Sequence, residues 1–596
     1  MKKFALFNFS CASAYLLALV NAQSISWVTL FVHLIILSYG MLMMLYALRL
    51  MALFTSNKVI NYVTLIILFS SYSYAVLNYT MLFVAFENWG HPMTLPMLKA
   101  YSNETPLLVR SLPWTLGSIL TTAVLILTFI FLLSIYMAKN VRSDLVGLKN
   151  KKFLLVGFKR RMVLILPVVF LIGLLSWNTV ANGIPYRLQL SKDPILSLYI
   201  YRAPQADMHF TLDQIISRRD YPEDLSFDKK NIILIICDAL RADHIGTYGY
   251  NRANTPFLDS MADIPNAIKL ENYYATSSNS MKGIINTLTS NYNTDNNQFG
   301  IHDLLKKQGY IINFVLSGDH TNFYGLRKAY GENLDLYHDG FTMLQQGPEN
   351  QTSVNDDLLV LKNLEQLNQY SGDPNFFYLH YMSAHQSGKV QSKYEHYFPN
   401  KANLGGLDSV TLINDYDNRM AQLDDYLRQS FNELKSKGFF ENAILIVTGD
   451  HGQALMENGR YWHAKSTDWS EIKIPFIMIQ TGASVSKKYD PAQIANQLDL
   501  GPTLIDMLEL PKPDVWQGRS IFGNDHRDWI FQRQKPYYAT IWSENQTIYQ
   551  YSYNRQSESE RYFQFESRGA IAINSSEPLK ADSARNAVRV FFSLKK

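Results

Sequence analysis

The chain has 596 residues, of which 18% are charged and 47% are hydrophobic, and its formal net charge is +4. This length exceeds a single hydrophobic core, so several structural units are expected. The small net charge argues against a nucleic-acid-binding protein, which would concentrate Lys and Arg on its folded domain. The two cysteines, Cys11 and Cys237, are too few for a disulfide framework.

Long apolar segments fill the first 182 residues. A membrane-spanning helix needs about 20 apolar residues, and four uncharged segments are close to that length or longer: 27–48, 63–86, 113–137 and 162–180. A shorter segment, 4–20, follows two lysines and is consistent with a fifth span or with a cleaved signal peptide. We therefore predict an N-terminal α-helical transmembrane bundle of about five spans in residues 1–182.

The loop between the last two predicted spans, residues 139–161, is strongly basic. It carries Lys139, Arg142, Lys149, Lys151, Lys152, Lys159, Arg160 and Arg161. The positive-inside rule places this loop in the cytoplasm, so the chain after residue 182 is expected outside the cytoplasm, which is the periplasm if the cell is Gram-negative. We predict a multi-pass protein of the inner (cytoplasmic) membrane. The basic loop is either a topology signal alone or also a site for anionic lipid or for a cytoplasmic or membrane protein partner.

Residues 183–228 contain four prolines and are predicted to form a juxtamembrane connector. From residue 229, short apolar runs alternate with helical periods, which predicts an α/β domain over residues 229–525. Expected buried strands are the runs 232–236, 312–316, 376–379 and 443–447. Apolar residues from Tyr416 to Leu434 recur every three or four positions ahead of Gly438, which predicts an amphipathic helix. Residues 526–596, rich in tyrosine, are predicted to form antiparallel strands at the edge of the main sheet.

Three groups of polar residues directly follow predicted strands: Asp238, Asp319 with His320, and Asp450 with His451. In α/β sheets, ligands bind beyond the carboxyl ends of the strands. A divalent cation needs carboxylate oxygens and imidazole nitrogens that converge from separate elements. Asp238, Asp450 and His451 meet this need if their strands are neighbours. Each of these residues taken alone is also typical of a cap or a turn.

Two segments match a known superfamily. The run NIILIICDALRADHIGTYGYNRANTPFLDSMA resembles the opening strand and loop of sulfatases, phosphonate monoester hydrolases and phosphoethanolamine transferases of the alkaline phosphatase superfamily, and AILIVTGDHGQ is similar to their second metal motif. The resemblance implies an alkaline-phosphatase-like fold and places metal ligands on Asp238, Asp450 and His451. It implies one or two divalent ions, with zinc, manganese and magnesium all suited to these ligands.

The resemblance also implies two further histidines in the site. His463 follows the second motif at the interval of the superfamily's phosphate-binding histidine. In LHYMSAHQSG, His385 stands where a histidine of the transferases contacts the transferred group. His385 as a surface histidine is the alternative.

The nucleophile is expected within YYATSSNSMKGIINTLTS. This segment holds no cysteine, which argues against a sulfatase that matures a cysteine to formylglycine. The phosphoethanolamine and glycerol-phosphate transferases use a threonine, and the apolar pattern that follows puts Ser280 in its place, as nucleophile and as a further metal ligand. Thr276, Ser277 and Ser278 are rivals, and the polar run is also typical of a helix cap.

The whole architecture resembles inner-membrane sulfatase-like proteins that bind cardiolipin or lipopolysaccharide and regulate envelope synthesis. Two functions follow. The first is a metal-dependent phospho-ester transferase or hydrolase that acts, through a serine, on phospholipid headgroups, lipopolysaccharide or envelope glycans, because a tethered site meets lipids at high effective concentration. The second is a catalytically weak, lipid-binding regulator. A third possible function is that of a sulfatase or phosphatase of small molecules, which would not need the transmembrane half of the chain.

Overall fold

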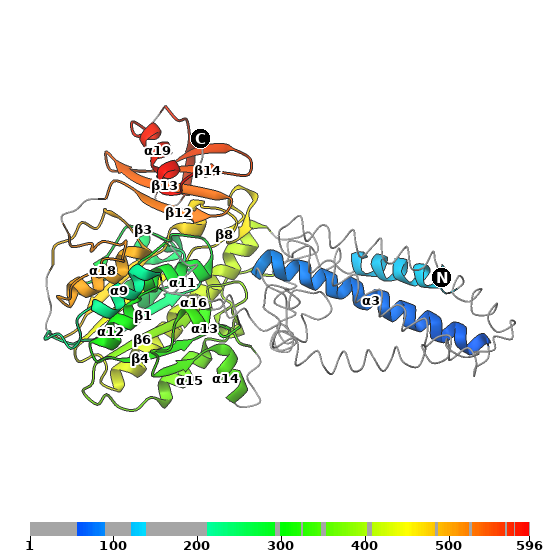
Figure 1. The fold of residues 1–596 in the computed structure, drawn as a ribbon, viewed down its shortest axis with the longest axis horizontal. Helices are drawn as coiled ribbons and strands as arrows, with labels where there is room; N and C mark the ends of the chain where they lie inside the picture. The colour runs from blue at the N-terminus through cyan, green and yellow to red at the C-terminus, as the bar shows by residue number, and fades with distance from the viewer. Residues whose placement is uncertain are drawn as a thin grey trace. The chain divides into compact units, whose positions relative to one another are not determined.

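The computed structural model describes residues 57–89, 121–136, 138, 211–292, 298–322, 326–346, 353–401, 408–482, 487–523, 527–566, 569–576 and 578–594 (Figure 1). They belong to two compact units. One unit contains the described residues between 57 and 138, and the other contains the described residues from 211 to 594.

In the first unit, helix α3 (Asn57–Trp89) contains the predicted span 63–86. Its segment Asn61–Thr80 is apolar and long enough to cross a bilayer, and a shorter apolar helix covers Thr121–Tyr136, within the predicted span 113–137. Large apolar side chains such as Tyr62 and Ile66 are exposed on α3, as expected of a helix surface that faces lipid. The predicted segments 4–20, 27–48 and 162–180 and the basic loop 139–161 lie outside the described residues, so the number of spans stays a prediction.

The predicted connector is described from residue 211 onward, and there it forms helix α9 (Leu212–Asp220). The Thr211 hydroxyl caps α9 by accepting a hydrogen bond from the Gln214 amide at 3.3 Å. The Gln214 side chain is buried, donates to Gln298 Oε1 at 2.6 Å and accepts from the Phe299 amide at 2.8 Å. These contacts fix α9 to the rest of the second unit.

A seven-stranded sheet forms the centre of this unit, in the order β2-β10-β7-β1-β6-β4-β5. The four predicted strands are confirmed and lie side by side in its middle, parallel to one another. The strands are β1 (Asn231–Cys237), β2 (Ile268–Lys269), β4 (Ile311–Leu316), β5 (Leu336–His338), β6 (Asn375–Tyr381), β7 (Ala443–Gly449) and β10 (Phe476–Gln480). Strand β10 runs antiparallel to both β7 and β2.

The central strands bury both faces, which explains their continuous apolar sequence. Along β1, Ile232 and Leu234 pack into one core and Ile233 and Ile235 into the other, as the alternation of side chains in a strand requires. The core that contains Ile232 and Leu234 is covered by α11 (Ser280–Thr289), α12 (Ile301–Lys307) and α18 (Leu500–Met507). The core that contains Ile233 and Ile235 is covered by α10 (Pro256–Ala262), α15 (Leu358–Gln366) and α16 (Ser409–Ser436). Helix α16 confirms the predicted amphipathic helix.

Shorter elements connect these layers. They are β3 (Asn272–Tyr274), β8 (Ala454–Leu455), β9 (Tyr461–Trp462), β11 (Ile494–Asn496), α13 (Leu326–Ala329), α14 (Gly340–Gln346), α17 (Trp469–Ile472) and the 3-10 turns η4 (Ala242–His244), η5 (Gly246–Tyr248), η6 (Ser392–Tyr394), η7 (Glu457–Gly459) and η8 (Gln497–Asp499). Strands β8 and β9 pair as a hairpin, and β3 pairs with β11.

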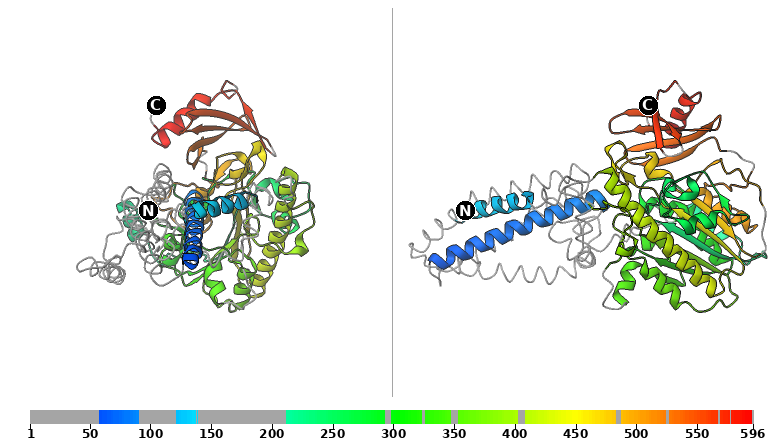
Figure 2. Two further views of the ribbon diagram at one scale, coloured as in Figure 1. Left: turned by 90° about the vertical axis from the view of Figure 1, so that its right-hand side faces the viewer. Right: turned by 180° about the vertical axis from the view of Figure 1, so that it is seen from behind.

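The C-terminal residues form antiparallel strands, as predicted, and these strands make a sheet of their own, from which Ile541, Ile548 and Phe565 pack into one of the two cores of the main sheet. Figure 2 shows this five-stranded sheet, in orange and red, as a separate layer. Its strands follow chain order: β12 (Ile530–Gln534), β13 (Tyr537–Glu544), β14 (Thr547–Asn554), β15 (Ser559–Glu566) and β16 (Gly569–Ile573). Helix α19 (Ala581–Phe591) packs on it through Ala584 and Val588.

Candidate metal centre

The two acidic residues of the predicted metal site come together at the carboxyl ends of neighbouring strands. Strands β1 and β7 pair in parallel with Cys237 opposite Gly449, so Asp238 and Asp450 leave the sheet side by side. Asp450 Oδ1 accepts hydrogen bonds from the amides of Ala239 at 3.0 Å and His451 at 2.7 Å. Its other oxygen, Oδ2, is therefore held toward Asp238 and the His451 ring.

Ser280 reaches the same point from the first turn of α11. Its Oγ lies 2.9 Å from His451 Nε2. The three rival hydroxyls have other partners: Thr276 donates to Gln497 Oε1 at 3.1 Å, Ser277 to Gln534 Oε1 at 2.9 Å and Ser278 to the Ser466 carbonyl at 2.6 Å. Of the four hydroxyls, the one in contact with His451 is that of Ser280.

The hydrogen bonds of His451 fix its tautomer. Nδ1 lies 2.7 Å from the Gly452 carbonyl, which only accepts, so Nδ1 carries the proton and Nε2 presents a lone pair. Nε2 lies 3.6 Å from Asp238 Oδ1 and 3.5 Å from Asp450 Oδ2. Both of these oxygens are buried and have no hydrogen-bond partner among the described residues. Three electron-rich atoms that face one another in this way fit a divalent cation between them.

The electrostatics of the two carboxylates support the same conclusion. Burial raises the pKa of Asp238 well above its usual value, and the nearby charge of Asp450 raises this pKa further, while a hydrogen bond from Ser280 opposes the shift. Two buried carboxylates without a counter-charge are unfavourable. A bound cation would remove this cost.

His380 belongs to the cluster and was missed in the sequence. Ligand atoms of Asp238, His380 and Asp450 lie within 4.8 Å of one another. His380 Nδ1 lies 3.0 Å from the Ser317 carbonyl, which leaves the buried Nε2 as a lone pair without a partner among the described residues. The signal was present, because His380 directly follows the predicted run 376–379, as Asp238 follows the run of β1.

His385 and His463 complete a group of imidazoles beside the metal ligands. The ring centroids of His451 and His463 are 4.3 Å apart, and those of His463 and His385 are 4.9 Å apart. His385 is 8% exposed, so its alternative as a surface histidine is wrong. Burial lowers the pKa of His385 to about 3 and that of His463 well below its usual value. Both rings are therefore neutral at pH 7.

The two neutral rings present different groups. The Ser387 amide donates to His385 Nδ1 at 3.0 Å, so the His385 proton lies on Nε2. His463 Nδ1 donates to Gln453 Oε1 at 2.9 Å, so His463 Nε2 is a lone pair. His385 offers a hydrogen-bond donor and His463 an acceptor.

The third polar group predicted at a strand end lies outside the metal cluster. Asp319 accepts a hydrogen bond from the backbone amide of Asn322 at 2.8 Å, as a turn residue does, so the turn alternative holds for it. Burial raises the pKa of Asp319 to about 7. His320 Nε2 lies 3.3 Å from His380 Nδ1. His320 therefore packs behind His380.

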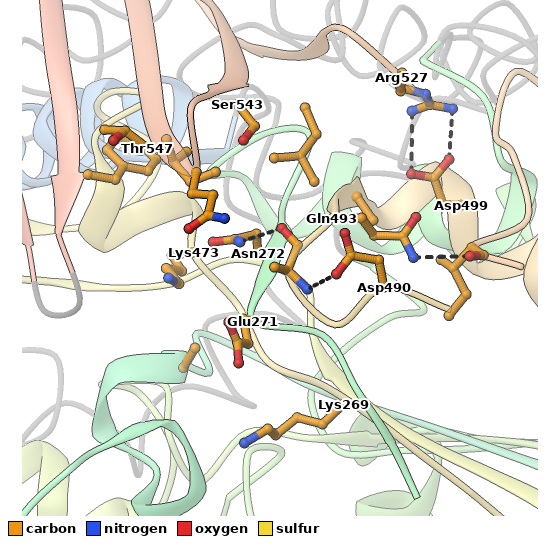
Figure 3. Close-up of a pocket in the computed structure, with 18 of the residues that line it drawn as sticks. Lys269, Glu271, Asn272, Lys473, Asp490, Gln493, Asp499, Arg527, Ser543 and Thr547 are labelled. Carbon is orange, nitrogen blue, oxygen red and sulfur yellow. Dashed lines mark hydrogen bonds and ion pairs between the residues drawn. The ribbon is translucent and has the colours of Figure 1, made fainter. Parts of the chain in front are cut away.

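The cavity in Figure 3, with a volume of about 1050 Å³, does not include the metal cluster in its walls. It is lined by charged and amide side chains, among them Lys269, Glu271 and Lys473. Several wall residues are already paired within the protein, as in the 2.7 Å ion pair between Arg527 and Asp499.

Gly283 lets α11 approach β7 closely enough to bring Ser280 to His451. A Cβ at Gly283 would lie 2.2 Å from the Asp450 carbonyl oxygen, which is backbone and cannot move aside. Gly283→Ala is expected to displace α11, to destabilise the protein by about 1–3 kcal/mol and to weaken metal binding. Thermal unfolding and metal content, each compared with wild type, test this. Unchanged values for both would show that α11 does not need this contact.

Glu471 supports the loop before α17 and is expected to make stability depend on pH. Its carboxylate accepts from the Lys465 amide at 3.0 Å, and burial raises its pKa to about 7. Because the folded pKa exceeds the unfolded one, the stabilisation is complete below about pH 4.5 and is lost as the pH rises through 7, a total of about 3 kcal/mol. The melting temperature of wild type relative to Glu471→Gln should therefore fall by several degrees between pH 5 and pH 8. A constant difference would contradict the shifted pKa.

Comparisons with known proteins find a family model, relatives and solved structures that are similar to this chain. The sulfatase family model matches residues 230–510. Phosphoethanolamine transferase OpgE of Escherichia coli (strain K12) is 24% identical over 280 residues, which are 44% of this chain and 48% of that protein. Lipoteichoic acid synthase 2 of Bacillus subtilis (strain 168) is 21% identical over 345 residues, which are 52% of this chain and 50% of that protein. The chain thus spans about half the length of these curated relatives.

Solved structures with a similar chain include the integral membrane protein lipooligosaccharide phosphoethanolamine transferase A (EptA) from Neisseria meningitidis. It is 16% identical, with a TM-score of 0.46 over 86% of this chain and 96% of that one. The C-terminal periplasmic domain of EcEptC from Escherichia coli, in complex with Zn, is 17% identical, with a TM-score of 0.44 over 53% and 93%. The sulfatase family model thus matches the part of the chain that contains the seven-stranded sheet and both motifs, residues 230–510.

Proposed function

We propose that this protein is a membrane-anchored, metal-dependent enzyme that uses Ser280 to transfer or hydrolyse the phosphorylated headgroup of an envelope lipid. The observation that carries the proposal is the 2.9 Å contact of Ser280 Oγ with His451 Nε2, beside two buried carboxylate oxygens that lack partners among the described residues. Serine hydroxyls are weak nucleophiles unless such a site activates them. The relatives named as phosphoethanolamine transferase and lipoteichoic acid synthase support the same class of reaction.

Asp238, Asp450, His451 and Ser280 would hold the cation, with His380 close enough to contribute. Imidazole nitrogens together with carboxylates favour zinc over magnesium. When bound, the ion would supply positive charge against a phosphoryl oxygen and against the deprotonated serine.

The chain's own residues would carry out two substitutions at phosphorus. Ser280 Oγ, having lost its proton, attacks the phosphorus of the donor as the bond from phosphorus to the diacylglycerol oxygen breaks, and that oxygen takes up a proton. An acceptor hydroxyl, from a glycan or from water, then attacks the phosphoserine, and Ser280 leaves and regains a proton. The headgroup is transferred with its phosphate.

The two neutral histidines suit complementary tasks. His385 Nε2–H is placed to donate a hydrogen bond to a phosphoryl oxygen, where negative charge grows in the transition state. His463 Nε2, a free lone pair, is placed to accept the proton of the incoming hydroxyl. This division follows from the contacts of His385 with Ser387 and of His463 with Gln453.

The apolar N-terminal helices support a reaction at a bilayer. An inner-membrane anchor with the sulfatase-family domain outside would expose the site to phospholipids at high effective concentration. The candidate donors of the headgroup are phosphatidylethanolamine and phosphatidylglycerol. The candidate acceptors are lipopolysaccharide and an envelope glycan. A catalytically weak regulator is disfavoured, because such a protein has no need of a complete set of ligands, nucleophile and histidines.

The direct test uses full-length protein in detergent, loaded with zinc and mixed with total bacterial phospholipid. We expect release of diacylglycerol, its loss after chelation and its return on adding zinc. Saturable lipid binding without diacylglycerol release, from protein that contains metal, would support the regulator instead.

A further inference from the structure

His380 stands near the end of β6, next to the acidic ligands of the candidate metal centre. Strand β6 pairs in parallel with β1, with His380 opposite Ile236. At the next position the Asp238 amide donates to the Tyr381 carbonyl at 2.8 Å. Ligand atoms of Asp238, His380 and Asp450 lie within 4.8 Å of one another, and two atoms on opposite sides of a bound zinc ion are about 4 to 4.5 Å apart. The His380 ring is therefore within reach of an ion held by the two carboxylates.

Ser317, the first residue after β4, holds both the backbone and the ring of His380. Its amide donates to the His380 carbonyl at 2.9 Å, and its own carbonyl oxygen lies 3.0 Å from His380 Nδ1. Because a carbonyl oxygen only accepts, Nδ1 carries the proton and the buried Nε2 keeps its lone pair. Histidines that bind metals typically donate their other N–H to a backbone carbonyl in this way.

His320 donates to the same carbonyl oxygen. Its Nε2 lies 3.1 Å from the Ser317 oxygen, and its ring stands against that of His380, with centroids 4.6 Å apart and planes at 79°. Gly318 turns the chain back through a φ of +94°, which brings His320 over Ser317. The Tyr330 hydroxyl lies 2.7 Å from His320 Nδ1. Since the proton of His320 is on Nε2, the Tyr330 hydroxyl is the donor and fixes this tautomer.

His320 takes no part in the proposed reaction, yet its side chain is buried and both of its nitrogens are bonded. A carbonyl oxygen has two lone pairs, and at Ser317 the two imidazoles occupy both. Removing His320 would leave one of these lone pairs without a donor and would open space behind the His380 ring, which could then turn its Nε2 away from the carboxylates. Groups that support a ligand histidine in this way change metal affinity by about 10- to 100-fold.

We propose that His380 is a further ligand of the cation, and that His320 is the positioning residue that aims His380 Nε2 and so makes the centre select zinc over manganese. The inference rests on the proposed function, because it concerns the ion that serves Ser280. With His380 the centre offers two imidazole nitrogens, His451 being the other. Imidazole suits zinc, whereas manganese is bound well by oxygen ligands alone. Loss of the aim should therefore weaken zinc binding more than manganese binding.

The test measures the affinity of metal-free, full-length protein for zinc and for manganese, and the visible spectrum of the protein loaded with cobalt(II). In His320→Leu, zinc binding should weaken by about 10- to 100-fold and manganese binding by less. The cobalt spectrum of this variant should shift toward that of His380→Ala. In His320→Gln the amide Nε2 can still donate to the Ser317 carbonyl, so most of the zinc affinity should return.

His302→Leu is the matched control. His302 is also a buried histidine, and its Nε2 lies 2.9 Å from the Tyr330 carbonyl, but it is not among the metal-binding group of Asp238, His380 and Asp450. Its replacement should lower the melting temperature, because a buried side chain is lost. The ratio of zinc to manganese affinity and the cobalt spectrum should stay as in wild type.

An unchanged affinity ratio and spectrum in His320→Leu, or an unchanged spectrum in His380→Ala, would overturn the inference while leaving catalysis by Ser280 intact. If His320→Leu does not fold, Tyr330→Phe decides, because it removes only the hydroxyl that fixes the His320 tautomer. A lower ratio of zinc to manganese affinity in Tyr330→Phe supports the inference, and a wild-type ratio overturns it. A wild type that binds none of the three ions would reject the proposed function itself, and the inference with it.

Discussion

Replacing Ser280 with alanine is expected to slow the release of diacylglycerol by at least about 10³-fold, because the substitution removes the hydroxyl proposed to form the covalent intermediate. Ser280 Oγ is the hydroxyl in contact with His451 Nε2, at 2.9 Å. The variant should keep its fold, because Ser280 is a helical residue of α11 and alanine has a high helix propensity. Initial rates with purified phospholipid, together with melting temperatures, measure both effects.

Two further variants separate the nucleophile from its neighbours. Ser280→Thr keeps a hydroxyl at the position and should retain measurable turnover. Ser277→Ala removes a hydroxyl that is bonded to Gln534, and it should leave the rate within a few-fold of wild type. A Ser280→Ala protein that is as active as wild type would show that another group attacks the phosphorus.

Asp238→Asn is expected to weaken zinc binding by at least about 100-fold, because loss of supporting groups alone costs metal sites 10- to 100-fold. The metal-free variant should nevertheless melt above the metal-free wild type. Burial and the charge of Asp450 raise the pKa of Asp238 in the folded protein. The stabilisation linked to that carboxyl is present below about pH 4 and is lost as the pH rises, so the gap between the two metal-free proteins should widen toward neutral pH.

Asp319→Asn is the matched control. Asp319 is also a buried carboxylate after a central strand, and burial also raises its pKa, but it bonds Asn322 and lies outside the metal cluster. Its replacement should leave zinc content and the zinc-induced rise in melting temperature as in wild type. Equal zinc affinity in Asp238→Asn and wild type would contradict the proposed ligand set.

The centre of the fold was predictable because four parallel strands bury both faces and so appear as continuous apolar runs. The edges were not. Strand β2 has only two residues, and β10 pairs antiparallel with its neighbours in the sheet. Neither feature produces a hydrophobic pattern that can be recognised in the sequence. The C-terminal strands were predictable from their tyrosines, but their pairing into a separate sheet depends on register between β12 and β16, which composition does not specify.

The site was predictable where a polar residue directly follows a strand or stands in a specific motif. Asp238, Asp450, His451 and Ser280 converge as the sequence indicated. His380 was missed although it directly follows its apolar run, because it lies within strand β6 and not in the loop after it, where Asp238 and Asp450 stand.

Covalent catalysis by Ser280 predicts a mass change on one peptide of the protein. Full-length, zinc-loaded protein carrying His463→Gln, a change intended to slow the second substitution, is incubated with phospholipid, and its peptides are analysed by mass spectrometry. We predict a phosphorylated headgroup on the peptide that contains Ser280, absent when Ser280→Ala is added. An adduct on a different residue, or none from metal-loaded protein that binds lipid, would contradict the account.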